Sequence, residues 1–418
     1  MDQQRRSSGG SGGSGGVGGW HQSAGIGLGS LGFADLMATL VWPRLLAAAR
    51  LALRPARLGL GVLMLVLIGL IAQIPRLWVR TGADTPYDGP LSMGSDLARR
   101  GLSKIIHGVF DLSPKDAAAG LFDLFIELPR QLIDQYPWGS LAVFVPALLV
   151  WAVGGGAIAR SAATEFSLDR RTSWPRALAF ALSRWGSLFS SLAAPLLIVG
   201  LLIGLMAVLG LGLLGIAYVN VVTSMLYFLV LLAGFVAVVI LVAYLLATPM
   251  LVPACACEGT DAIDGIQRCY AYVTGRPFKL VLYSAILLVQ AVVVAVVIGA
   301  LAQATISLSL WSSSLLLPEF FGYAVQAQGD PSITVDTAAL SPTAAFATRV
   351  VGFWVAVPAL IVGAYVVSFW FSGGTVLYLL MRQVCDGQDT GELWTPGLIA
   401  GTHATPEAEP APEVDEEE

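Results

Sequence analysis

Residues 187–211 read SLFSSLAAPLLIVGLLIGLMAVLGL, and they lie within a longer run that has no Asp, Glu, Lys or Arg between Arg184 and Glu258. A second uncharged run extends from Lys279 to Glu319. About 20 apolar residues already cross the hydrocarbon core of a bilayer, so runs of this length predict membrane-spanning helices. The composition agrees, because charged residues make up only 12% of the chain, against about 25% in soluble proteins. The sequence therefore predicts an all-α integral membrane protein.

The apolar runs predict six spans within a membrane domain of residues 34–398. The spans are placed at about 58–74, 140–158, 187–211, 221–247, 278–301 and 350–380. Two outer loops, 76–138 and 302–349, follow the first and fifth spans. The proposed spans contain no charged residue. This argues against a proton- or ion-coupled carrier, because charges within spans commonly mark such pathways.

Arginine and lysine are concentrated on alternate connections between the spans. They precede the first span, occupy the connections after the second and fourth, and follow the sixth. Basic connections remain in the cytoplasm, so this pattern predicts a protein of the cell inner membrane with both termini cytoplasmic. The net charge of −5 carries little weight, since much of it comes from residues 407–418. No basic stripe with interleaved aromatic residues indicates a nucleic-acid partner.

Both ends of the chain have the composition of disordered segments. Residues 1–33 are rich in Gly and Ser, which predicts a flexible tether. Residues 399–418 alternate Ala, Pro, Thr and acids, and such a tail cannot bury enough apolar surface to fold. We expect the tail to be solvated, with binding to a basic partner as the alternative.

A charged motif, EGTDAIDGIQRCYAYVTGRPFKL at 258–280, connects the fourth and fifth spans. An imperfect copy at 165–188 keeps the spacing of its two arginines, and WPR at 174–176 is echoed by WPR at 42–44. We interpret the chain as three units, each an amphipathic cytoplasmic helix followed by a two-span hairpin, in a pseudo-threefold bundle. The acids that close the second, fourth and sixth spans are Glu165, Glu258 and Asp386.

The motif suggests how each unit begins. Thr260 or Asp261 is expected to cap the helix that follows Glu258, and Ile263, Ile266, Tyr270 and Val273 form an apolar stripe along it. The charged residues would either meet lipid phosphates or pin helix ends and lock neighbouring units together, and we favour locking. The candidates for lipid head-group or inter-repeat contacts are Arg44, Glu165, Arg176, Arg184, Glu258, Arg268, Arg276, Lys279 and Asp386.

The outer loops also contain amphipathic segments. The sequence predicts helices at Asp96–Ile106 and Ala117–Leu132 and a similar segment at Trp311–Tyr323. Helices of this kind lie in the membrane interface or cap a bundle. We expect them to pack on the bundle, with a substrate-binding lid as the alternative.

The motif at 258–280 resembles the inter-hairpin motif of uncharacterised bacterial polytopic membrane proteins. These include the membrane region attached to some glycerophosphoryl diester phosphodiesterases. A weaker resemblance covers 165–188. This chain lacks a soluble domain with metal-binding His, Glu and Asp. The resemblance therefore implies a helical bundle close to lipid and does not imply hydrolysis.

Residues that would carry catalysis are few. The three histidines, His21, His107 and His403, lie in different segments and suggest neither a triad nor a metal site. We therefore expect no enzymatic activity, no cofactor and no metal. The alternative is a zinc site, because four thiolates on the cytoplasmic side would suit that ion. Its ligands would be Cys255, Cys257, Cys269 and Cys385.

The role that the sequence favours is that of an accessory or membrane-organising protein. Its expected partners are membrane lipids and proteins at the cytoplasmic face. A permease or channel for a small or lipid-like substrate is the second hypothesis. A central ring formed by Glu165, Glu258 and Asp386 would favour a pore.

Overall fold

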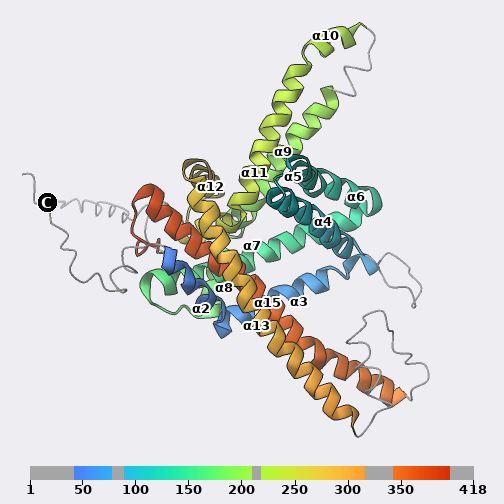
Figure 1. Cartoon of the computed structure of the whole chain (residues 1–418), viewed down its shortest axis with the longest axis vertical. Helices are drawn as coiled ribbons and strands as arrows, with labels where there is room; N and C mark the ends of the chain where they lie inside the picture. The colour runs from blue at the N-terminus through green and yellow to red at the C-terminus, as the bar shows by residue number, and fades with distance from the viewer. Residues whose placement is uncertain (1–41, 78–88, 210–217, 316–341, 396–418) are drawn as a thin grey trace, which may run out of the picture. The chain divides into compact units, whose positions relative to one another are not determined.

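The computed structural model describes residues 42–77, 89–209, 218–315 and 342–395, and its regular elements are all helices (Figure 1). The predictions for the two chain ends, 1–33 and 399–418, lie outside these residues. So do much of the 302–349 loop and most of its amphipathic segment.

Five helices are long and apolar enough to cross a membrane. They are α7 (Pro137–Leu168), α9 (Trp185–Ala207), α11 (Tyr227–Glu258), α13 (Pro277–Ser314) and α15 (Pro342–Asp386), whose apolar part begins at Val350. A sixth candidate is a broken span, in which Pro43–Ala52 and Pro55–Ile71 meet at 65°. It comprises η1 (Trp42–Leu46), α2 (Ala47–Ala52) and α3 (Pro55–Ile71). These helices indicate a multi-pass membrane protein.

The helices extend beyond the spans predicted from hydropathy. α7 continues past Ile158 to Leu168, and α11 continues to Glu258. α13 enters the predicted 302–349 loop as far as Ser314. The predicted spans themselves are uncharged, but the helical extensions beyond them carry charges. Arg57, Arg160, Glu165, Glu258 and Arg382 all lie within them.

Local sequence accounts for where these helices begin and end. Proline is the first residue of α3, α7, α13 and α15. Its fixed φ suits a first helical turn, and the amide N–H that it lacks would have no partner within the helix at that position. α7 and α11 are each followed by a left-handed residue, Asp169 (φ 50°) and Gly259 (φ 60°), and Gly387 (φ 71°) follows α15. A left-handed residue after a helix turns the chain so that the following amides donate hydrogen bonds to the last carbonyls of the helix.

Shorter helices connect the spanning ones. They are η2 (Ile74–Leu77), α4 (Pro90–Phe110), α5 (Pro114–Phe122), the π-helical turn η3 (Asp123–Glu127), α6 (Leu128–Gln135), α8 (Trp174–Ser183), α10 (Val219–Met225) and α12 (Ala262–Gly275). α4 and α6 contact α7, and the Phe125 ring of η3 lies 6.4 Å from the Tyr244 ring of α11. This arrangement fits the interpretation that the amphipathic helices predicted at Asp96–Ile106 and Ala117–Leu132 pack on the bundle.

The spanning helices follow one another along the chain as three pairs: α3 and α7, α9 and α11, and α13 and α15. The second helices of these pairs, α7, α11 and α15, contact one another. Each first helix packs beside its second: α3 on α7, α9 on α11 and α13 on α15. The shorter helices follow a similar order, because α8 packs on α7 and α12 on α11, while α2 packs on α15. The Ser368 hydroxyl donates to the Ala52 carbonyl over 2.8 Å. The first described helices therefore pack against the last.

Candidate functional site

The most distinctive cluster of polar groups is a set of buried charges near the ends of α7, α11 and α15. We call it the charged junction and define it by Arg57, Arg160, Glu165, Glu258 and Arg382. All five side chains are buried, and Arg57 and Arg382 are the largest fully buried side chains of the described residues. Ionised groups cost several kcal/mol to bury, so each needs close polar partners.

The first ion pair connects α3 to α7. Arg57 Nη2 lies 2.7 Å from Glu165 Oε2, and Arg54 Nη2 lies 2.6 Å from Glu165 Oε1. The Arg57 guanidinium also donates to the Leu51 and Ser161 carbonyls and to the Ser161 hydroxyl. Glu165 therefore balances a cation that is already bound by neutral acceptors.

The second ion pair connects α11 to α15. Arg382 Nη1 lies 2.6 Å from Glu258 Oε1, which also accepts a hydrogen bond from the Tyr378 hydroxyl at 3.0 Å. Arg268 of α12 lies 3.5 Å from the other carboxylate oxygen of Glu258. Burial alone would lower the pKa of Arg268, but the Glu258 carboxylate raises it. Glu258 thus joins α11, α12 and α15 in one polar contact.

Arg160 differs from the other buried arginines because its hydrogen-bond acceptors are neutral carbonyls. It donates to the carbonyls of Ala256 at 3.1 Å and Trp394 at 2.8 Å. Its guanidinium carbon lies 4.7 Å from the centre of the Phe180 ring and 5.9 Å from that of Trp394. Cation–π contacts and carbonyls therefore hold this arginine between α7, α8, α11 and the segment after α15.

The segment after α15 returns to the charged junction. Trp394 is buried, its amide donates to the Cys257 carbonyl, and its ring packs on Gly259. Arg184 stacks on the same ring, 4.7 Å from its centre, and donates to the Gly259 carbonyl. Arg382 donates to the carbonyls of Asp389 and Glu392. The junction thus fixes this returning segment through backbone groups.

The site residues predicted from the sequence divide into two groups. Glu165, Glu258, Arg184, Arg268 and Asp386 contact other parts of the protein, and the Tyr272 hydroxyl donates to Asp386. The other four are exposed and form no ion pair with any described residue. They are Arg44, Arg176, Arg276 and Lys279.

The three predicted acids have separate partners. Glu165 binds Arg54 and Arg57, Glu258 binds Arg268 and Arg382, and Asp386 accepts from Tyr272. Each carboxylate is therefore occupied by a different contact within the protein.

The structure differs from the predicted cap of α12 and agrees with only part of its predicted apolar stripe. Asp261 occupies the N-cap position, but its side chain makes no capping hydrogen bond, and the buried Thr260 hydroxyl has no partner within the described part of the chain. The helix also packs through Ala262, Gly265 and Cys269, whereas Ile263 is 66% exposed. Of the rest of the predicted stripe, Ile266 and Tyr270 are half-buried and Val273 is buried, while the small residues allow close approach to α11.

The cysteines do not assemble as a metal site. Cys255, Cys257 and Cys269 are buried, and Cys385 is half-buried. Across the described ranges, no group of three or more His, Cys, Asp or Glu side chains could hold a metal ion. Burial raises the pKa of Cys269 well above its usual value, which keeps this thiol protonated.

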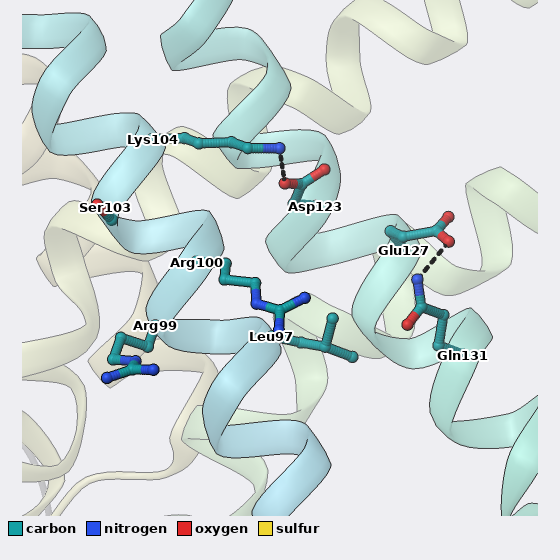
Figure 2. Close-up of a pocket in the computed structure, with 8 residues that line it drawn as sticks. All are labelled: Leu97, Arg99, Arg100, Ser103, Lys104, Asp123, Glu127 and Gln131. Atoms are coloured by element: carbon teal, nitrogen blue, oxygen red, sulfur yellow. Dashed lines mark hydrogen bonds and ion pairs between the residues drawn. The ribbon is translucent and has the colours of Figure 1, made fainter.

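A second polar site lies between α4, η3 and α6. It is a groove of about 590 Å³ lined by basic and acidic side chains (Figure 2). Lys104 pairs with Asp123, and Gln131 donates to Glu127. Figure 2 shows the Arg100 guanidinium between α4 and the segment that carries Glu127 and Gln131. Arg100 forms no ion pair among the described residues, so it is the group available to an anion.

The arginines that matter most to the junction are not among the site residues predicted from the sequence. Arg57, Arg160 and Arg382 each follow or precede a predicted span, where the sequence indicates only orientation. The spacing to the acid that closes each span is a local signal that two of these arginines lie within helices. Arg160 lies five residues before Glu165, and Arg382 lies four before Asp386. This spacing places each arginine inside the last turns of a helix and not in a loop.

Comparison of the chain with protein-family models, curated proteins and solved structures finds no match.

Proposed function

We propose that this protein is a non-enzymatic accessory protein that organises the inner membrane, with both termini in the cytoplasm. Its three hairpins act as repeated units, each led by an amphipathic helix that lies along the cytoplasmic surface. It resembles the polytopic proteins described above in this design. Its partners are membrane lipids and proteins that meet the cytoplasmic face.

The observation that carries this proposal is the internal pairing of the charged junction. The carboxylates of Glu165 and Glu258 bind arginines of the same chain, and Arg160 binds carbonyls and aromatic rings. α11 and α15 also approach closely beside the junction, where a Cβ at Gly374 would collide with the Pro249 carbonyl oxygen. A junction whose charges are used internally is suited to holding helices together and not to handling a substrate.

The exposed basic residues support the lipid part of the proposal. Arg44, Arg176, Arg276 and Lys279 are spread over η1, α8, the α12–α13 connection and the start of α13. Each has a cationic end outside the ion pairs of the junction and an alkyl stem that can lie along acyl chains. Each basic residue near an anionic membrane surface contributes roughly 1 kcal/mol to attraction.

A permease is the second candidate, and the groove of Figure 2 is the observation that favours it. Its exposed Arg100 would receive an anionic solute. α4–α6 connect the end of α3 to the start of α7, so the groove is attached at the ends of these helices away from Arg57 and Glu165.

Flux into vesicles distinguishes the two candidates. The full chain is reconstituted into liposomes, and leakage of chloride, phosphate and small organic anions is compared with that of protein-free vesicles. The accessory role predicts equal rates, and it predicts no change when Glu165, Glu258 and Asp386 are replaced by the amides. Anion flux that is lost in Arg100→Gln and kept in Arg99→Gln would instead establish transport.

A further inference from the structure

An apolar cavity of about 250 Å³ lies between α13 and α15, and Pro249 of α11 closes one side of it. Leu287 and Phe369 form its buried floor, and Leu288 and Trp370 lie at its exposed rim. Gly373 of α15 has no side chain to extend between Phe369 and Leu287, and Gly374 lies directly against the Pro249 carbonyl.

The cavity lies beside α13, the first helix of the third pair, which lacks a contact that the first helices of the other two pairs make. α3 packs on its own partner α7 and also on α15, the last helix of another pair. α9 likewise packs on α11 and on α7. α13 packs on α15 but makes no comparable contact with α11 over their described lengths. The cavity occupies the place of that missing contact, so the third hairpin has a gap that helices fill in the other two.

The surroundings of the cavity determine what can fill it. All three helices are apolar enough to span a membrane, and the neighbouring side chains Val281, Leu282 and Leu288 are more than half exposed. In a bilayer such a surface faces acyl chains. The cavity is smaller than the roughly 300–1,000 Å³ of sites that enclose whole small molecules. Its size and lining therefore suit one hydrocarbon chain.

Cations lie at one end of the cavity. Lys279, in the first turn of α13, and Arg276, the residue just before that helix, precede the lining residue Ser284, which places them about 7–12 Å away along the helix axis. Both are exposed, and both interact electrostatically with Cys385 near the end of α15. Asp386, which accepts from Tyr272, is the carboxylate on the same turn. Two cations against one carboxylate leave a net positive charge for a phosphate. The separation between these cations and the cavity suits a phospholipid whose phosphate lies at the cations and whose acyl chain enters the cavity.

We propose that this cavity binds one acyl chain of an anionic membrane phospholipid whose phosphate lies at Arg276 and Lys279. This inference rests on the proposed function and makes its lipid partner specific: the lipid replaces the missing packing of α13 on α11. The chain would complete the third hairpin, and the head group would anchor the start of α13.

Native mass spectrometry of the full chain tests this proposal. The protein is purified in mild detergent, exposed to equal amounts of phosphatidylglycerol and phosphatidylcholine, and scored for retained lipid. The wild type should keep one phosphatidylglycerol. Ala291→Phe fills the cavity and should lower retention about tenfold, the effect of losing roughly two buried methylenes. Ala285→Phe is the matched control, because Ala285 is exposed on the same helix and does not line the cavity.

A second variant tests the head group without entering the core. Arg276→Gln with Lys279→Gln removes two exposed charges and should lower the preference for phosphatidylglycerol over phosphatidylcholine about tenfold. Equal retention in Ala291→Phe, Ala285→Phe and wild type would overturn the proposal, as would an unchanged preference in the double variant. Lipid retention is measured without any flux assay. Its failure would therefore leave the accessory role intact, and anion flux would defeat the accessory role without affecting this result.

Discussion

The two ion pairs of the charged junction use the same chemistry but connect different parts of the chain. Arg57–Glu165 joins α3 to α7, the successive helices of the first pair. Arg382–Glu258 joins α11 to α15, which belong to different pairs, and recruits Arg268 of α12. The first ion pair therefore strengthens one hairpin, whereas the second couples two hairpins. Placement, and not the type of contact, determines what a buried ion pair holds together.

Loss of the inter-hairpin pair should have the largest effect. Glu258→Gln keeps the side-chain shape but leaves Arg382 buried without a counter-charge, and it should lower the free energy of unfolding by about 3–5 kcal/mol. Reversible unfolding in a titration with sodium dodecyl sulfate measures the change. Asp386→Asn is the control, since Asp386 is exposed, and it should cost much less. Equal losses in the two variants would show that burial of the pair is unimportant.

Loss of the pair within the first hairpin should cost less. In Glu165→Gln, each guanidinium nitrogen of Arg57 keeps a neutral acceptor on Leu51 or Ser161, whereas Nη1 of Arg382 donates to Glu258. Arg54, whose side chain is 34% exposed, can also turn to water. The expected loss is about 1–3 kcal/mol in the same titration. A loss larger than that of Glu258→Gln would reverse the order of the two ion pairs.

Thiol labelling tests how well α12 covers the second ion pair. Cys269 is fully buried against α11, and burial raises its pKa, so this thiol stays in its unreactive protonated form near neutral pH. At pH 7–8 a maleimide should label the half-buried Cys385 and leave Cys255, Cys257 and Cys269 unlabelled until the protein is denatured. Cys385→Ser should abolish native labelling. If Cys269 reacted as fast as Cys385, α12 would not be packed as described.

The helical membrane fold can be predicted from the sequence, because a long uncharged apolar run is stable mainly as a helix within a bilayer. The five long helices lie at predicted spans, and the first span corresponds to the broken helix pair. These features depend on local composition, which a single sequence displays directly.

The charged junction is only half predictable from the sequence. Glu165 and Glu258 are expected to pin helix ends or lock units together; Glu258 pairs between two hairpins, whereas Glu165 pairs within the first. Their partners Arg57 and Arg382 are not predicted, because hydropathy ends a span at the first charge. A buried arginine is tolerated only when distant residues supply its acceptors, and such partners cannot be recognised in local sequence. The return of Trp394 to Gly259 is unpredictable for the same reason.

A double-mutant cycle at Glu258 and Arg382 tests whether the charged junction is a structural connection between hairpins. The unfolding free energies of Glu258→Gln, Arg382→Gln and the double variant are measured under the same conditions as wild type. We predict a coupling energy of about 1–3 kcal/mol, since contacting residues in one network are not additive. Additive losses, within about 0.5 kcal/mol, would contradict a structural connection, because they would show that the two side chains do not act together.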